Sequence, residues 1–187
     1  MRRACKNFPM KIFPLILLAC VLAIPSFAQD AKTNAMPDQT SATNKMGAPV
    51  AAFPVSAGVI TAPFVVTNGI LSQPETTELG DGGKAVYNFT ITNAGNYLIL
   101  GMVSAEEETM NSFFVNVDAQ PDDLMIWDID LTKGFEERTV NWRGNGGADS
   151  GEFVPKRFKL SAGAHKLIIV GREPAQLKSI SIRPTAE

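Results

Sequence analysis

One stretch near the C-terminus, residues 161–173, constrains the fold of this chain more than any other. Its sequence is SAGAHKLIIVGRE, which starts as a turn at Gly163, continues as an apolar strand and ends in two opposite charges. Phe158 and Leu160 alternate just before it, and another alternating run covers residues 177–182. Apolar runs of this length that are bounded by turn residues are typical of β-strands. We therefore expect the chain to end in a β-hairpin that packs on a core.

The chain from residue 58 onward consists of short extended runs separated by turns. Residues 85–92 alternate cleanly, with Tyr87, Phe89 and Ile91 on one face. No segment has a helical period of useful length. About eight or nine short strands joined by turns predict an all-β fold, an antiparallel β-sandwich or jelly roll. The other expected strands cover residues 59–66, 97–103, 112–118, 124–129, 138–142 and 154–160.

The N-terminus has the features of an export signal. Basic residues precede an apolar run at residues 12–24, and the small residues Ser26 and Ala28 occupy the positions that a signal peptidase reads. We expect residues 1–28 to be a signal peptide and the protein to be periplasmic or extracellular. An uncleaved anchor is an alternative, although the run is short for a membrane span. Lipid attachment at Cys20 is another.

Cleavage of such a signal changes the composition of the chain. It removes both cysteines and four of the 17 basic residues, so the net charge falls to about −6. A disulfide, a thiolate metal site and a cysteine nucleophile are then excluded, and nucleic acid and anionic membranes are unfavourable partners. Residues 29–57 are rich in small and polar residues, which predicts a disordered linker. Residues 58–187 then form one domain of ordinary size.

Catalytic chemistry has few candidates in this sequence. The single histidine, His165, shares an apolar face with Leu167 and Ile169, so we interpret it as structural. Without Cys or a second His, a Cys–His pair and a multi-histidine zinc site are excluded, and no Gly-x-Ser-x-Gly motif supplies a serine nucleophile. Carboxylates that hydrolyse glycosides or bind calcium stay open as alternatives. The candidate acids are Asp118, Asp122, Asp123, Asp128 and Asp130.

The order of several short motifs resembles that of a known family. These motifs are Gly95-x-Tyr97, the run at residues 111–118, Trp127 and Trp142, the glycine-bearing strand at residues 158–173, and Leu177-x-x-Ile180-x-Ile182. Over residues 85–182 the chain resembles galactose-binding-like jelly-roll domains, in particular the carbohydrate-binding modules of families six and thirty-five.

That resemblance implies a two-sheet jelly roll without catalysis, which binds sugars through loops at one end of the sandwich. Many members also hold a structural calcium with acids of the first strand and near the last strand. This sequence departs from that pattern, because residues 59–66 contain no acid and Lys178-Ser179 stand where members often have an aspartate. We therefore expect no cofactor and no metal site of the family type.

The glycine-rich segment after Trp142 offers the chemistry that sugars need. A flat ring packs against the C–H face of a pyranose, and planar polar groups bind adjacent hydroxyls. Trp142, Arg143 and Asn145 supply these groups within WRGNGG, and Trp127 supplies a second indole. The alternative for each tryptophan is a place in the core.

Arg172 and Glu173 are further candidates for the carbohydrate site. They stand at the end of a strand, where they either face ligand loops or brace the sandwich through an ion pair. The leading hypothesis is an exported, non-catalytic module that binds a polysaccharide or oligosaccharide and cooperates with a separate enzyme. A structural or adhesive module that contacts envelope proteins is the alternative, and a small glycoside-active enzyme is a third.

Overall fold

The computed structural model describes residues 47–143 and 154–185, which all lie in one compact unit. They form two antiparallel sheets and three short 3-10 helices, at Val55–Ala57, Glu108–Met110 and Pro121–Asp123. The first sheet has seven strands: in order β10 (Phe158–Leu160), β6 (Gly95–Ser104), β12 (Gln176–Pro184), β4 (Ile70–Ser72) and β3 (Val65–Thr67), with β1 (Ala51–Pro54) beside β12 and β9 (Glu136–Thr139) beside β6. The second has five: β2 (Val59–Thr61), β5 (Lys84–Ile91), β11 (Gly163–Gly171), β7 (Ser112–Val117) and β8 (Met125–Asp128).

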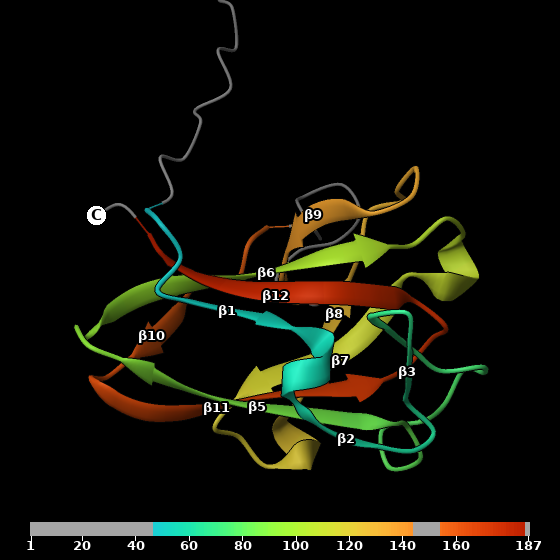
Figure 1. Cartoon of the computed structure of the whole chain (residues 1–187), viewed down its shortest axis with the longest axis horizontal. Coiled ribbons are helices and arrows are strands. Elements are labelled where there is room, and N and C mark those ends of the chain that lie inside the picture. Colours follow the sequence, from blue (N-terminus) through green and yellow to red (C-terminus); the bar gives the residue numbers. More distant parts are fainter. Residues whose placement is uncertain (1–46, 144–153, 186–187) are drawn as a thin grey trace, which may run out of the picture. The chain divides into compact units, whose positions relative to one another are not determined.

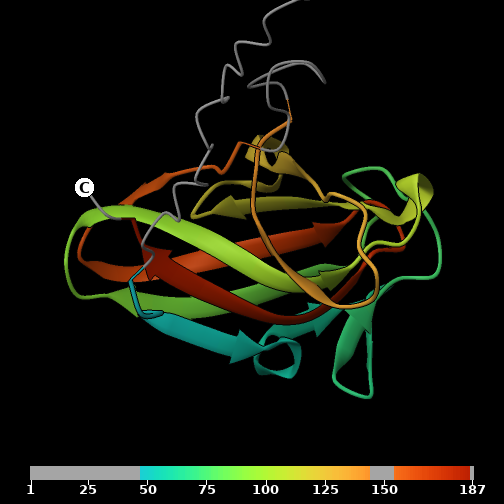
Figure 2. The same cartoon turned by 90° about the horizontal axis from the view of Figure 1, so that it is seen from above.

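The two sheets face each other across one hydrophobic core, as Figures 1 and 2 show. The expected alternation in β5 is confirmed, because Tyr87, Phe89 and Ile91 are all buried. Successive side chains of a strand point to opposite faces, so every second residue reaches the core. The sheets approach closely where Gly101 of β6 faces Trp127 of β8, since a Cβ atom at Gly101 would lie 2.6 Å from the indole. The predicted β-sandwich is therefore confirmed.

The expected C-terminal hairpin is wrong. β11 and β12 follow each other in the chain but belong to different sheets. β11 pairs with β5 and β7, while β12 pairs with β6, β1 and β4, so residues 172–175 cross from one sheet to the other. Alternation reports which face of a strand is buried, whereas pairing depends on which backbone edges meet in space. Both strands bury one face in the same core without bonding to each other.

The expected linker extends too far into the folded part. β1 pairs with β12 over four residues, Phe53 stacks on Tyr87 at 5.8 Å between ring centroids, and the Tyr87 hydroxyl donates to the carbonyl oxygen of Val55 at 3.0 Å. The boundary expected at residue 57 therefore lies before β1, because Phe53 and Val55 supply the apolar contacts that small neighbours lack. The expected strand at residues 59–66 is also divided, into β2 of one sheet and β3 of the other.

The predicted signal peptide at residues 1–28, the lipidation alternative at Cys20 and the first part of the linker lie outside the described residues. Within residues 47–143 and 154–185, none of the helices has the length and apolar character of a membrane span.

Candidate functional site

Trp142 lies at the β8 edge of the second sheet with its ring in contact with solvent. It is 38% exposed, and the other aromatic side chains of the described residues are buried or half-buried. The following residue holds it there, because the Arg143 backbone N–H donates to the carbonyl oxygen of Ile126 in β8 at 3.1 Å. The Lys156 ammonium lies 4.7 Å from the indole centroid, a cation–π contact. Trp142 therefore presents an aromatic surface beside a cation.

A planar ion pair adjoins this tryptophan. The Arg143 guanidinium donates from both Nε and Nη2 to the two carboxylate oxygens of Asp128, whose side chain is almost completely buried. Asn141 fixes the backbone of Asp128 in turn: its Oδ1 accepts from the Asp128 N–H at 3.0 Å, and its Nδ2 donates to the Asp128 carbonyl at 2.5 Å. A bidentate pair on a rigid strand end holds its polar groups in fixed directions.

The roles of Asp128 and Asn141 at this site are seen only in the structure. In the sequence Asp128 is one of several acids and Asn141 is an ordinary polar residue before a tryptophan. They also line a polar cavity of about 200 Å³ beside the ion pair. The remaining lining residues of that cavity are Ile129, Asp130, Glu137, Arg138, Thr139 and Pro155. Carboxylates, an amide and a hydroxyl in one hollow are groups that bind ligand hydroxyls.

Arg172 and Glu173 are tied to the start of β7. Arg172 Nη1 donates to Ser112 Oγ at 2.6 Å and to Glu173 Oε1 at 2.5 Å, and the Asn111 N–H donates to Glu173 Oε2 at 3.1 Å. Their side chains are only 23% and 12% exposed. These internal bonds connect the crossing between the two sheets to a neighbouring strand, which is the geometry of a brace.

Of the two remaining candidates, Trp127 is buried and Asn145 is not described by the structure. Trp127 is 1% exposed and packs on Phe113 with ring centroids 5.9 Å apart. Its indole therefore has no face for a ligand, which corrects its inclusion among the carbohydrate-binding residues. Trp127 lies on the face of β8 that points into the core, and the short apolar run in the sequence does not show which face that is. Asn145 lies outside the described residues.

His165 has a structural place at the other end of β11. Nδ1 lies 2.7 Å from Asp118 Oδ2, Nε2 lies 2.9 Å from the carbonyl oxygen of Ser161, and the ring packs on Phe89. The hydrogen bond to Asp118 raises the pKa of His165, and burial opposes this rise. Within the described residues, no three His, Cys, Asp or Glu side chains gather as metal ligands.

No protein-family model matches the sequence, and no curated protein matches it either. Several solved structures do. They include a mannanase with a family 35 module from Podospora anserina (TM-score 0.52, 11% identity, 73% of this chain but only 28% of that one). Two isolated modules match over nearly their whole lengths. CBM6cm-2 of Cellvibrio mixtus lichenase 5A, in complex with cellotriose, has a TM-score of 0.50 and 16% identity, and the match covers 74% of this chain and 100% of that one. A family 35 module of Clostridium thermocellum has a TM-score of 0.50 and 9% identity, and the match covers 73% of this chain and 98% of that one.

The fold is therefore that of the carbohydrate-binding modules of families 6 and 35, as the order of motifs in the sequence indicated. At these low identities the similarity defines the architecture. The residues of the site rest on the geometry described above.

Proposed function

We propose that this protein is an exported, non-catalytic carbohydrate-binding module that holds a polysaccharide or oligosaccharide at Trp142 and Arg143. The observation that carries the proposal is the exposed indole of Trp142 beside the fixed Arg143–Asp128 pair. An indole packs on the C–H face of a pyranose, and the polar groups beside it bind the hydroxyls at the ring edge. The shared fold of modules such as the one solved with cellotriose supports this function. Export rests on the signal features of residues 1–28.

The position of the acids favours binding over hydrolysis. Glycoside hydrolysis requires two carboxyl groups that act on opposite sides of the scissile bond. Both oxygens of Asp128 accept from Arg143, so that carboxylate is committed to the ion pair. We therefore assign Asp128 a positioning role for the Arg143 side chain. A separate enzyme is the partner that would act on the bound glycan.

The exposure of Trp142 also separates this function from the structural or adhesive alternative. The structural or adhesive alternative predicts a buried Trp142 and an apolar patch elsewhere on the surface. Trp142 is instead 38% exposed. This favours a glycan as the ligand.

The test is affinity electrophoresis of the full chain on plant and algal polysaccharides, followed by fluorescence titration with the polysaccharide that retards it most. Trp142→Ala removes the ring and is expected to weaken binding about 30-fold, since truncating a central aromatic costs about 2 kcal/mol. Val59→Ala is the matched control, because Val59 is an exposed apolar residue of β2 at the opposite edge of the same sheet.

Trp142→Phe adds a direct readout. It leaves buried Trp127 as the emitter in the folded part, so the change in fluorescence upon binding is expected to disappear while binding is largely retained. Folded wild-type protein that no polysaccharide retards would contradict the proposed function. Equal binding by wild type and Trp142→Ala would remove Trp142 from the site.

A further inference from the structure

One side of the sandwich is built from a segment without any charge. Residues 46–74 contain no Asp, Glu, Lys, Arg or His, and their described part includes β1, β2, β3 and β4. β1 and β4 both pair with β12 on the edge opposite β6, and β3 pairs with β4. β2 is an end strand of the second sheet. Figure 2 shows these elements, coloured cyan to green, along one side of the sandwich.

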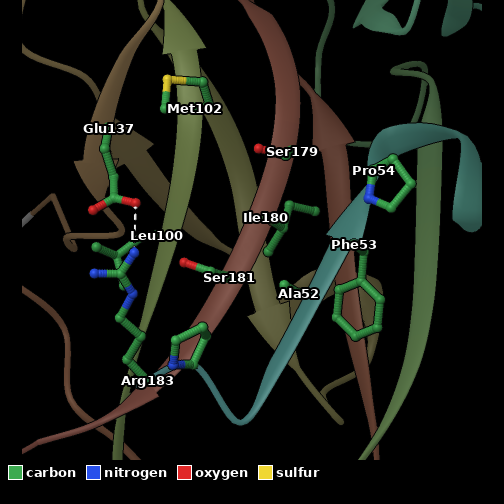
Figure 3. Close-up of a pocket in the computed structure, with 11 residues that line it drawn as sticks. Ala52, Phe53, Pro54, Leu100, Met102, Glu137, Ser179, Ile180, Ser181 and Arg183 are labelled. Carbon is green, nitrogen blue, oxygen red and sulfur yellow. Dashed lines mark hydrogen bonds and ion pairs between the residues drawn. The ribbon is translucent and has the colours of Figure 1, made fainter. Parts of the chain in front are cut away.

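The surface on this side is apolar and without net charge. Val65 and Val66 of β3 are 52% and 37% exposed. A groove of about 410 Å³ beside β1, on the outer face of β6 and β12, adds no net charge, because its charged lining residues, Glu137 and Arg183, bond to each other at 2.9 Å (Figure 3). Exposed apolar surface of this kind marks sites of protein–protein contact.

The backbone of β3 offers an open edge at the same place. Within the described residues β3 pairs only with β4, through a two-residue turn in which Asn68 and Gly69 have positive φ. The residues that flank such a turn exchange both of their hydrogen bonds, so the N–H and C=O of Val66, one residue further along, point to the open edge. Proteins commonly close such edges with a charged residue, a proline or a bulge, and β3 has none of these.

A second copy of this chain fits the open edge. The exported chain is net acidic, so two copies repel each other unless they meet on a surface without charge. Antiparallel pairing about a twofold axis at Val66 lets this residue exchange two backbone hydrogen bonds with its counterpart, and it places Val65 opposite Thr67. Closed twofold contacts are the commonest arrangement in soluble oligomers.

We infer that the protein forms a twofold dimer through the β3 edge, with Val65 and Val66 in the interface. β2 and β8 are the two ends of the second sheet, so Trp142, at the β8 edge, lies on the other side of the sandwich from the uncharged segment. The dimer therefore carries two Trp142 sites directed away from the interface. Two linked sites bind one polysaccharide more tightly than a single site does. This gain rests on the proposed function, whereas the dimer does not.

Sedimentation velocity of residues 29–187, which contain the whole folded unit, tests the dimer without any glycan. Between micromolar and millimolar concentration, the wild type is expected to shift from the monomer mass to twice that mass. Val66→Lys brings two like charges together at the twofold axis and is expected to stay monomeric. Leu131→Lys is the matched control, because Leu131 is 50% exposed and lies outside the uncharged segment, and it is expected to dimerise like the wild type.

Val66→Cys gives a second measurement that does not depend on the folding of the lysine variant. Residues 29–187 contain no cysteine, so a single thiol at the edge reports on self-contact, and mild oxidation is expected to give a covalent dimer that Leu131→Cys does not give. The inference is overturned by a wild type that stays monomeric at every concentration, which would leave the edge to a different partner. It is also overturned by a dimer that Val66→Lys leaves intact or that Leu131→Lys abolishes.

Retention on polysaccharide tests the gain from two sites. Val66→Lys is expected to bind the polysaccharide that retards the wild type at least about 10-fold more weakly, while its affinity for a hexasaccharide of the same sugar is unchanged. Equal retention of the two proteins would overturn the gain and leave the dimer in place. Absence of binding to every polysaccharide would contradict the proposed function, and the sedimentation result would still decide the dimer.

Discussion

Replacing Glu173 by alanine separates the brace from a binding role at the crossing between the two sheets. The change removes the acceptor of the Asn111 N–H, at 3.1 Å, and of Arg172 Nη1, at 2.5 Å. A buried donor that loses its partner costs about 1–3 kcal/mol. Because Arg172 is 23% exposed, water compensates part of its loss, so we expect Glu173→Ala to lower the free energy of unfolding by about 2–3 kcal/mol.

The assay is urea unfolding followed by tryptophan fluorescence, with glycan binding measured on the same samples below the transition. Glu107→Ala is the control, because Glu107 is an exposed acid of a nearby loop, and it is expected to change stability by less than about 0.5 kcal/mol. The brace predicts a lower unfolding midpoint with unchanged affinity for the glycan. Lost glycan binding with an unchanged midpoint would refute this reasoning and place Glu173 in the binding site.

Two further predictions concern the core and pH. Gly101→Ala is expected to destabilise the protein by about 1–3 kcal/mol in urea unfolding, since the new Cβ atom would lie 2.6 Å from Trp127. Gly95→Ala is the control and should have a smaller effect, because its Cβ atom meets only an ordinary contact. Equal destabilisation by the two variants would contradict the packing argument. The hydrogen bond to Asp118 raises the pKa of His165 in the folded protein. The His165–Asp118 pair therefore stabilises the fold fully below the pKa of His165 in the unfolded chain, about 6.5, and this stabilisation is lost as pH rises through the folded pKa. The free energy of unfolding in urea, measured from acidic to alkaline pH, should show this decline in the wild type and a flatter dependence on pH in His165→Gln. Parallel curves for the two proteins would exclude the His165–Asp118 pair as the cause of the decline.

Much of the fold could be predicted from local pattern. Alternation placed Tyr87, Phe89 and Ile91 on one buried face, and the strand expected at residues 97–103 is β6, in which Leu98 and Leu100 are buried as well. These predictions hold because burial of alternate side chains is a property of each strand that its own residues record.

The candidate site could be predicted only in part. Trp142 and Arg143 stand together in the sequence, and the structure keeps them together at the β8 edge. Asp128 is their partner only because the chain returns to β8 after β9, a contact between residues 15 positions apart that no local pattern records. Trp127 has the same chemistry as Trp142, but its strand turns it inward.

The sequence by itself determined that this chain forms a β-sandwich with a buried alternating core, because apolar periodicity specifies which face of each strand leaves water. Only the tertiary structure decided which strands pair. β11 and β12 divide between two sheets, β1 joins the fold from a segment of unremarkable composition, and the outer face of β6 and β12 becomes a groove. Backbone hydrogen bonds are chemically alike along every strand, so the choice among edges depends on how the whole core closes.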